Sequence, residues 1–260
     1  MNRVYLLGGH DLEMTEIAKV LRSSDVQFRD ENLGWDDSVF ARYRSSVDEI
    51  LAAGGTPVLV EIREIPDSYL NRVEVIDHHG PNSADLTSLE QVLARLGLPP
   101  TRWQALVAAN DKGHIDGLLA LSATPEEIRQ VRAADRRAQG ITAAEEVQAE
   151  HAIARADSPT RGLTVVQLPH ARMATVADRL HAASGGPGFG NLLVVSPREI
   201  NFSGDGWLVE RLHAAFGGFY GGNLPSRGFW GLTTDGPGIA DAVRHVIILE
   251  LAPAKLAFPV

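Results

Sequence analysis

Two patterns of apolar and polar positions alternate along the first part of the chain. Short segments rich in apolar residues predict strands at Arg3 to Leu7, Val26 to Phe28, Thr56 to Ile62 and Arg72 to Asp77, of which Thr56 to Ile62 has the pattern of a buried strand. Apolar residues at helical spacing predict helices at Leu12 to Leu21 and near Asp37 to Leu51. Strands that alternate with helices indicate a parallel sheet with helices on its faces.

The middle of the chain is expected to be helical. Thr124, with Pro125 after it and Glu127 three residues on, has the pattern of a helix N-cap with a capping box. Thr142 and Glu145 repeat that pattern further along the chain. These two helices form a predicted connector between two globular parts.

Arg155 to Gly162 lacks periodicity and contains Ser, Pro and Gly, so we interpret it as a linker and the hinge of the molecule. Strands and one amphipathic helix, Trp207 to Phe216, are expected after it. We also expect a glycine-rich loop at Gly217 to Gly231 and a closing strand at Arg244 to Leu251. The predicted fold class is therefore α/β, with an N-terminal parallel-sheet domain at 1–122, a helical connector and linker at 123–160, and a smaller C-terminal α/β domain at 161–260.

Composition and charge narrow the classes of function. The chain has 260 residues, 44% hydrophobic and 22% charged, with no cysteine, so any metal site must use His, Asp and Glu. The short apolar run at the N-terminus and the lack of a membrane-length segment favour a cytoplasmic protein without a membrane partner. A net charge of −9 argues against long nucleic acids but leaves room for a small anion held locally. The oligomeric state stays open, with a homodimer compatible with the sequence.

Polar residues follow the predicted strands at their carboxyl ends, where parallel sheets usually have their binding and catalytic residues. Glu61 interrupts the apolar run "VLVEI", where a carboxylate is costly to bury unless a cation or a donor satisfies it. The other such residues are His10, Asp11, Glu13, Asp77, His78, His79 and, after a further predicted helix, Asp111. Adjacent histidines are often only surface residues, and Asp11 and Asp111 could be helix caps. Carboxylates and imidazoles at one sheet edge nevertheless favour Mn²⁺ or Mg²⁺, and this set is sufficient for two ions.

The stretch "VIDHHGPNS" resembles the DHH phosphoesterase superfamily, which is named for the triplet seen here as Asp77, His78 and His79. That superfamily includes exopolyphosphatases, manganese pyrophosphatases, RecJ-type nucleases and phosphodiesterases of short RNA and cyclic dinucleotides. The resemblance implies an N-terminal domain with four metal-binding motifs and a small C-terminal domain that closes over the substrate. It also implies metal-assisted hydrolysis of a phosphoester.

The other motifs depart from the family pattern. "GGHDLEM" has Glu13 as its second acidic residue and a compressed spacing from His10 to Asp11, and Glu61 takes the place of an Asp. In the second domain, "SPREINF" supplies Arg198, but Asn223 in "GGNLPSRGFWG" replaces an expected His. Glu has one methylene more than Asp, so each of these two changes would move a metal ligand. The site could then hold a different metal, hold a single metal, or have a different function.

The roles that the resemblance implies can be carried over residue by residue. His10, Asp11 and Glu61 would hold one metal, and Glu61 would bridge to a second held also by Glu13, His78 and Asp111. The catalytic candidates are His79, facing the phosphate, and Asp77, orienting the histidines. The residues expected to bind the substrate are Gly221, Gly222, Asn223, Arg198 and Arg227, and His114 and Asp116 are further candidates.

A small phosphorylated molecule, a nucleotide or short oligonucleotide, is the expected substrate, bound in a cleft between the domains. Aromatic residues that could stack on a base are Phe202, Phe219, Tyr220, Phe229 and Trp230. Core packing is the alternative for these aromatic residues, and a solvated surface position is the alternative for Arg227. Two other functions remain open: a non-hydrolytic nucleotide or phosphate-binding protein, and another reaction on a phosphorylated metabolite.

Overall fold

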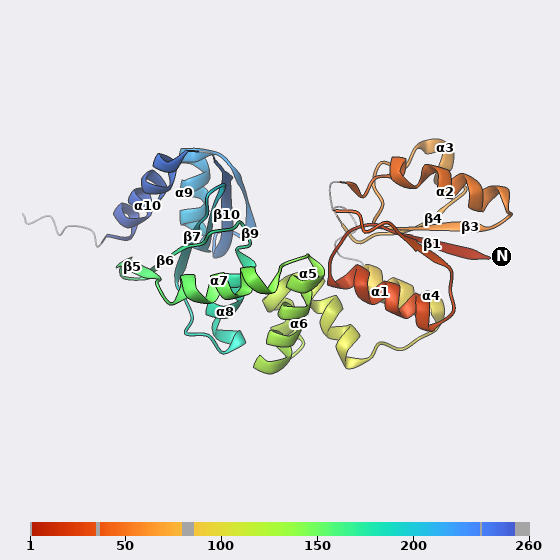
Figure 1. The fold of residues 1–260 in the computed structure, drawn as a ribbon, viewed down its shortest axis with the longest axis horizontal. Helices are drawn as coiled ribbons and strands as arrows, with labels where there is room; N and C mark the ends of the chain where they lie inside the picture. Colours follow the sequence, from red (N-terminus) through yellow and green to blue (C-terminus); the bar gives the residue numbers. More distant parts are fainter. Residues whose placement is uncertain (1, 35–36, 80–85, 235, 253–260) are drawn as a thin grey trace, which may run out of the picture. The chain divides into compact units, whose positions relative to one another are not determined.

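The computed structural model describes residues 2–34, 37–79, 86–234 and 236–252. The chain divides into two compact units, Met1–Gly140 and Ile141–Val260. Each unit has its own sheet flanked by helices (Figure 1), so the expected class, two α/β parts of which the second is smaller, is confirmed. The finer division at residues 122 and 160 stays a prediction.

The N-terminal sheet is parallel throughout and has the strand order β2-β1-β3-β4. Its strands are β1 (Arg3–Leu7), β2 (Phe28–Asp30), β3 (Thr56–Val60) and β4 (Glu74–Ile76). The first of these is central and pairs with β2 and β3. The carboxyl ends of β1, β3 and β4 therefore meet at one edge of the sheet.

Helices cover both faces of this sheet. In Figure 1, α2 (Phe40–Ala52) and α3 (Asp67–Leu70) lie above it, and α1 (Leu12–Ser23) and α4 (Ser88–Leu96) lie below. Alternate residues of β1 face opposite ways, as the pleat requires. Val4 and Leu6 pack with Tyr43 and Val47 of α2, whereas Tyr5 and Leu7 are also buried but belong to the other face.

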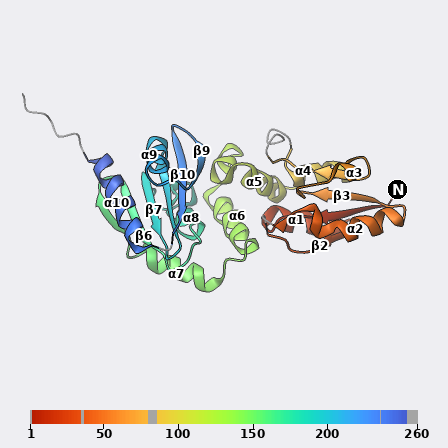
Figure 2. The same ribbon diagram turned by 90° about the horizontal axis from the view of Figure 1, so that it is seen from above.

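Two further helices complete the N-terminal unit: α5 (Arg102–Ala120) and α6 (Pro125–Ala138). They lie side by side in both views (Figures 1 and 2). The predicted capping box of Thr124 and Glu127 starts α6. A kink divides α5 at Gly113 and His114, which have non-helical backbone angles.

The C-terminal unit contains a six-stranded mixed sheet with the order β5-β6-β7-β8-β10-β9. Only β6 and β7 pair in parallel; the other neighbours are antiparallel. The strands are β5 (Asp157–Thr160), β6 (Leu163–Gln167), β7 (Asn191–Val195), β8 (Glu199–Asp205), β9 (Phe219–Asn223) and β10 (Arg227–Thr233).

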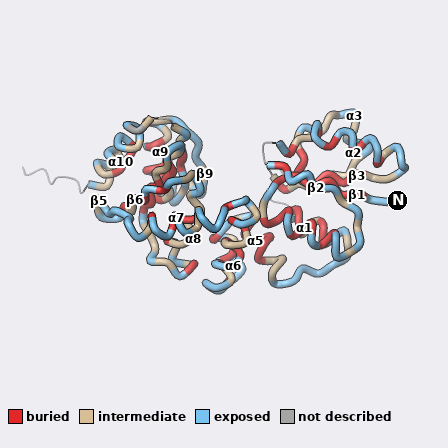
Figure 3. The backbone as a smooth tube through the Cα atoms, in the orientation of Figure 1, coloured by how far each residue is buried: buried red, intermediate tan, exposed pale blue. Residues whose placement is uncertain are grey.

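Helices flank this second sheet as well: α7 (Ala143–Ile153), α8 (Ala174–Leu180), the short 3-10 turn η3 (Ala182–Ser184), α9 (Gly206–Phe216) and α10 (Pro237–Leu251). Strand β7 shows how each face is filled. Leu193 packs in a cluster with residues of α9 and α10, and its neighbours Leu192 and Val194 pack in a cluster with residues of α7 and α8. Figure 3 accordingly shows a separate buried core in each unit.

Three predictions for the C-terminal part were wrong. The expected irregular linker at Arg155 to Gly162 contains strand β5. The expected glycine-rich loop forms the hairpin of β9 and β10. The expected closing strand is part of α10, because Val243 and Ile247, one helical turn apart, are the residues that enter the core.

Among the described residues, no helix combines the length and the apolar character that crossing a bilayer requires.

Candidate metal centre

Strand β1 leads directly into the candidate site. Gly9, with φ of 81°, turns the chain from the strand toward α1. Asp11 is the N-cap of that helix, and its Oδ1 accepts a hydrogen bond from the Met14 N–H at 2.9 Å. Glu13 lies in the first turn of the helix and is almost fully buried. The same turn thus fixes one carboxylate as a cap and directs another into the protein.

Glu61 follows β3 and is buried despite its charge. Its φ of 53° is uncommon for a residue with a side chain. The end of β1 approaches it so closely that a Cβ on Gly8 would lie 2.5 Å from the Glu61 carbonyl oxygen. Backbone strain of this kind tends to occur at functional sites, and here it accompanies a buried carboxylate at a strand end.

The triplet Asp77, His78 and His79 follows β4. Asp77 Oδ1 accepts a hydrogen bond from the His79 N–H at 2.9 Å and lies 3.0 Å from His79 Nδ1. The main-chain carbonyl of Asp77 accepts a bond from Gln91 Nε2 at 3.3 Å. Asp77 therefore orients His79, and the neutral ring that donates from Nδ1 carries its lone pair on Nε2. The rest of the motif, 80–83, lies outside the described residues.

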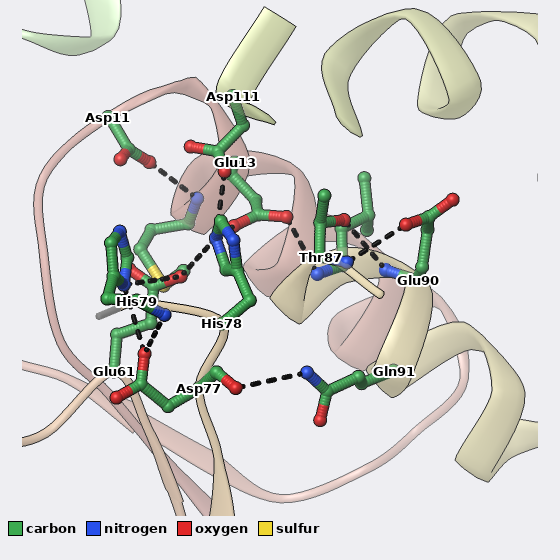
Figure 4. A network of polar contacts seen from close by, with 12 residues as sticks. Asp11, Glu13, Glu61, Asp77, His78, His79, Thr87, Glu90, Gln91 and Asp111 are labelled. Carbon is green, nitrogen blue, oxygen red and sulfur yellow. Dashed lines mark hydrogen bonds and ion pairs between the residues drawn. The ribbon is translucent and has the colours of Figure 1, made fainter. Parts of the chain in front are cut away.

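His78 is the centre of the cluster (Figure 4). Its Nε2 lies 2.8 Å from Asp111 Oδ2, 3.4 Å from Glu61 Oε1 and 3.5 Å from Glu13 Oε2. Asp111 belongs to α5 and lies just before the kink at Gly113 and His114, whereas the sequence predicted it to follow a helix. Four segments that are distant in sequence thus bring one imidazole and three carboxylates together.

These four atoms are buried, yet none forms a hydrogen bond with another described residue. The 2.8 Å contact between His78 and Asp111 is short enough for one, but its angles are unsuitable. Buried polar atoms without partners are costly. A cation among them would satisfy all four, and one nitrogen with several carboxylate oxygens suits Mn²⁺ or Mg²⁺. The residues present therefore fit a divalent metal.

Two overlapping groups of ligand atoms are compact enough for an ion. One consists of Glu13, His78 and Asp111, and the other of Glu61, His78 and His79. Within each group the potential ligand atoms lie within 4.8 Å of one another.

The crowding of buried carboxylates shifts the pKa values of the residues in the site. Burial, together with the negative charges of Asp111 and Glu61, raises the pKa of Glu13 to about 7. Burial also raises the pKa of Glu61. The carboxylates around His78, Asp111 first, raise the pKa of its ring. Protons thus stabilise the metal-free cluster, and a metal ion would take their place.

Two predicted ligands stand apart from these groups. His10 is exposed, and neither group of described residues contains it. Asp11 serves as the cap of α1, and burial, together with the charge of Asp111, raises its pKa to about 7. The helix-cap alternative for Asp11 is therefore correct, and its role as a ligand stays a prediction.

The residues expected to bind substrate all lie in the C-terminal unit. Gly221, Gly222 and Asn223 belong to β9, and Arg227 begins β10. The Arg227 guanidinium lies over the Phe189 ring and donates from Nη2 to the Gly190 carbonyl at 3.1 Å. Arg198 is exposed and lies in a bend directly before β8.

The five aromatic candidates divide into two sets. Phe202 and Trp230 are fully buried in the core, so the packing alternative holds for them. Phe219, Tyr220 and Phe229 are about half exposed, at 49%, 47% and 46%. The Phe219 ring covers Gly231 across the hairpin, where a Cβ would lie 2.2 Å from the ring.

Two groups that support the site were missed at the sequence level. The Leu89 N–H, in the first turn of α4, donates to Glu13 Oε1 at 2.8 Å. Ser38 Oγ accepts from the Gly9 N–H at 2.6 Å. The spacing of Thr87 and Glu90 is that of a capping box and marks a helix start, but nothing local in the sequence connects this start to Glu13.

No protein-family model and no curated protein matches the chain. Similar solved structures include a pGpG-specific phosphodiesterase, PggH, from Vibrio cholrae, with 14% identity and a TM-score of 0.46 over 95% of this chain and 97% of that one. RecJ in complex with Mn²⁺ from Thermus thermophilus has 11% identity and a TM-score of 0.46. That match covers 95% of this chain but 52% of RecJ, about half its length. Similarities this low do not establish an activity for this chain.

Proposed function

We propose that this protein is a metal-dependent phosphoesterase that hydrolyses a small phosphorylated substrate, a nucleotide or a short oligonucleotide. The observation that carries the proposal is the convergence of Glu13, Glu61, His78 and Asp111. Their four facing atoms are buried and lack hydrogen-bond partners among the described residues.

The ligands of the proposed centre are Glu13, Glu61, His78 and Asp111, with Mn²⁺ or Mg²⁺ as the ion. Asp11, His10 and His79 are the remaining candidates for a second ion. When bound, such ions lower the pKa of a water molecule and neutralise charge on phosphoryl oxygens. Among the residues of the chain, Asp77 holds the His79 ring through Nδ1. His79 Nε2 is then the atom with a lone pair for a ligand or a proton.

The His79 side chain, 38% exposed, contrasts with that of His78, which is 6% exposed. A substrate can therefore reach His79 more readily than His78. This difference supports His79 as the residue that faces the phosphate and His78 as the residue that holds metal.

The choice of substrate rests on charge and on aromatic side chains. A net charge of −9 disfavours long polyanions. Arg198 and Arg227 are exposed cations that we propose contact phosphate. Phe219 and Phe229 present ring surface on which a base can stack.

The test combines metal content with phosphoester hydrolysis. Purified protein is stripped with a chelator, titrated with Mn²⁺ and Mg²⁺, and then assayed for phosphate or nucleotide release from mononucleotides, dinucleotides and short oligonucleotides. We expect activity only with added metal and loss of activity in His78→Ala. Metal and nucleotide binding without release would favour the non-hydrolytic binding protein, and absence of metal binding would contradict the proposal itself.

A further inference from the structure

Helix α6 carries three charged residues on its buried face, Arg132, Asp135 and Arg136, of which the first two contact the elements of the proposed metal centre. Ile128, Val131, Arg132 and Asp135 recur at the spacing of one helix face, and all four are buried. Arg132 is 6% exposed and Asp135 is 4% exposed. A buried ion pair contributes little net stability compared with apolar residues of the same size. Stability alone therefore does not account for Arg132 and Asp135, and their contacts with neighbouring helices indicate another role.

Arg132 contacts α5 on both sides of the proposed ligand Asp111. Its Nη1 donates to Asn110 Oδ1 at 2.8 Å and lies 3.4 Å from His114 Nδ1. The same nitrogen donates to Asp135 Oδ2 at 2.9 Å. Because a guanidinium only donates, His114 Nδ1 is the acceptor in this contact.

Such support matters because α5 is interrupted just after Asp111. Gly113 has φ −153° and ψ 18°, and His114 has φ 47° and ψ −133°. The regular helical hydrogen bonds therefore do not continue undisturbed past the ligand. Arg132 braces the segment at Asn110 and His114, one before and one after the ligand.

Asp135 contacts the other element that carries proposed ligands. Its Oδ1 accepts a hydrogen bond from the Leu12 N–H at 3.4 Å. Leu12 lies between Asp11 and Glu13 at the start of α1. The second oxygen, Oδ2, accepts from Arg132 and from Gln139 Nε2 at 3.1 Å. One carboxylate thus connects the first turn of α1 to Arg132.

We propose that Arg132 and Asp135 are positioning residues that hold Asp111 and Glu13 at the distance a divalent ion requires. This inference rests on the proposed metal centre, since it assigns a role behind its ligands. Residues of this kind orient the groups that touch the metal, and their loss typically lowers metal affinity by about 10–100-fold.

The test compares variants of the full chain, freed of metal with a chelator, by Mn²⁺ titration calorimetry and by thermal unfolding in chelator. Asp135→Asn removes the charge and keeps an oxygen for Leu12. The double variant Arg132→Met with Asp135→Leu replaces the pair with apolar side chains. Arg129→Gln on the same helix is the matched control, because Arg129 belongs to an exposed pair with Glu126.

We expect the double variant to keep the unfolding midpoint of the parent within a few degrees and to bind Mn²⁺ about 10–100-fold more weakly. Asp135→Asn should weaken binding less, and Arg129→Gln should not change it. Parent-like affinity in a folded double variant would overturn the positioning role alone. If the double variant does not fold, Arg132→Lys decides, and unchanged affinity there overturns the role. A parent that binds no Mn²⁺ overturns the metal centre and the positioning role together.

Discussion

His78 Nε2 and Asp111 Oδ2 lie 2.8 Å apart without the angles of a hydrogen bond. One atom comes from the segment that follows strand β4 and the other from α5, just before its kink. Close approach without a hydrogen bond leaves lone pairs directed into a common space, and Glu13 and Glu61 add two more oxygens there. That arrangement favours metal ligation over an ordinary buried ion pair.

Replacement of His78 by Ala should abolish stoichiometric metal binding because His78 is the residue shared by both candidate groups. The loss of affinity should exceed the about 10–100-fold typical of residues that lie behind metal ligands. Metal analysis after dialysis measures it, with circular dichroism to check the fold. Asp111→Asn should also weaken binding, and His151→Ala, at an exposed histidine of α7, is the control. Normal metal content in both site variants would refute this ligand set.

Metal affinity should rise with pH through neutrality. Burial raises the pKa of Glu13 from 4.5 to about 7 and that of Asp11 from 3.8 to about 7. Raised pKa values stabilise the metal-free fold at acidic pH, and this contribution is lost as the pH rises from about 4.5 through about 7. A metal must displace the protons, so its affinity should increase by up to about tenfold per pH unit for each proton released.

Calorimetric titrations with Mn²⁺ between pH 5.5 and 7.5, in buffers of different ionisation enthalpy, measure both affinity and protons released. Glu13→Gln carries no titrating group at that position and should show a flatter dependence. Affinity that is constant over this range would contradict the ionisation argument.

The candidate site could be predicted in large part because it depends on strand ends. Glu61 and the triplet at Asp77 follow apolar runs that become adjacent parallel strands. The support behind the ligands could not be predicted in the same way. Leu89 and Asp135 act through contacts with α1 that arise only when the helices pack, and no local spacing in the sequence encodes them.

The errors in the C-terminal unit have the same origin. The run at Arg244 to Leu251 is apolar enough for either a strand or a helix, and only its packing through Val243 and Ile247 decides. The glycines at Gly221 and Gly231 indicated a loop, but each lies opposite a phenylalanine on the neighbouring strand. Rings that cover glycines allow a hairpin where composition alone predicts irregular structure.

The exposed rings of that hairpin should contribute to binding of a base. In Phe229→Leu the side chain stays apolar but loses its flat ring, so affinity for a nucleotide should fall by about 1–3 kcal/mol. Binding of inorganic phosphate should not change. Nucleotide and phosphate titrations of this variant, with Leu232→Val on the same strand as control, separate the two effects. Equal nucleotide affinity would show that Phe229 contacts no base.

Arg227 provides the last prediction because its side chain already has protein contacts, with Gly190 and over the Phe189 ring. These contacts hold the planar guanidinium, which can donate to two phosphate oxygens at once. Lysine keeps the charge and loses that geometry. Arg227→Lys should therefore raise the KM of the phosphorylated substrate by about tenfold or more, in the range of a charged hydrogen bond.

Steady-state kinetics measure this effect, and metal content should equal that of the parent because the proposed ligands belong to the other unit. Arg244→Lys is the matched control, since Arg244 is paired with Asp157 and has no proposed contact with substrate. If Arg227→Lys and the parent share the same KM and kcat, Arg227 does not touch the substrate, and its contacts with Gly190 and Phe189 serve only the fold.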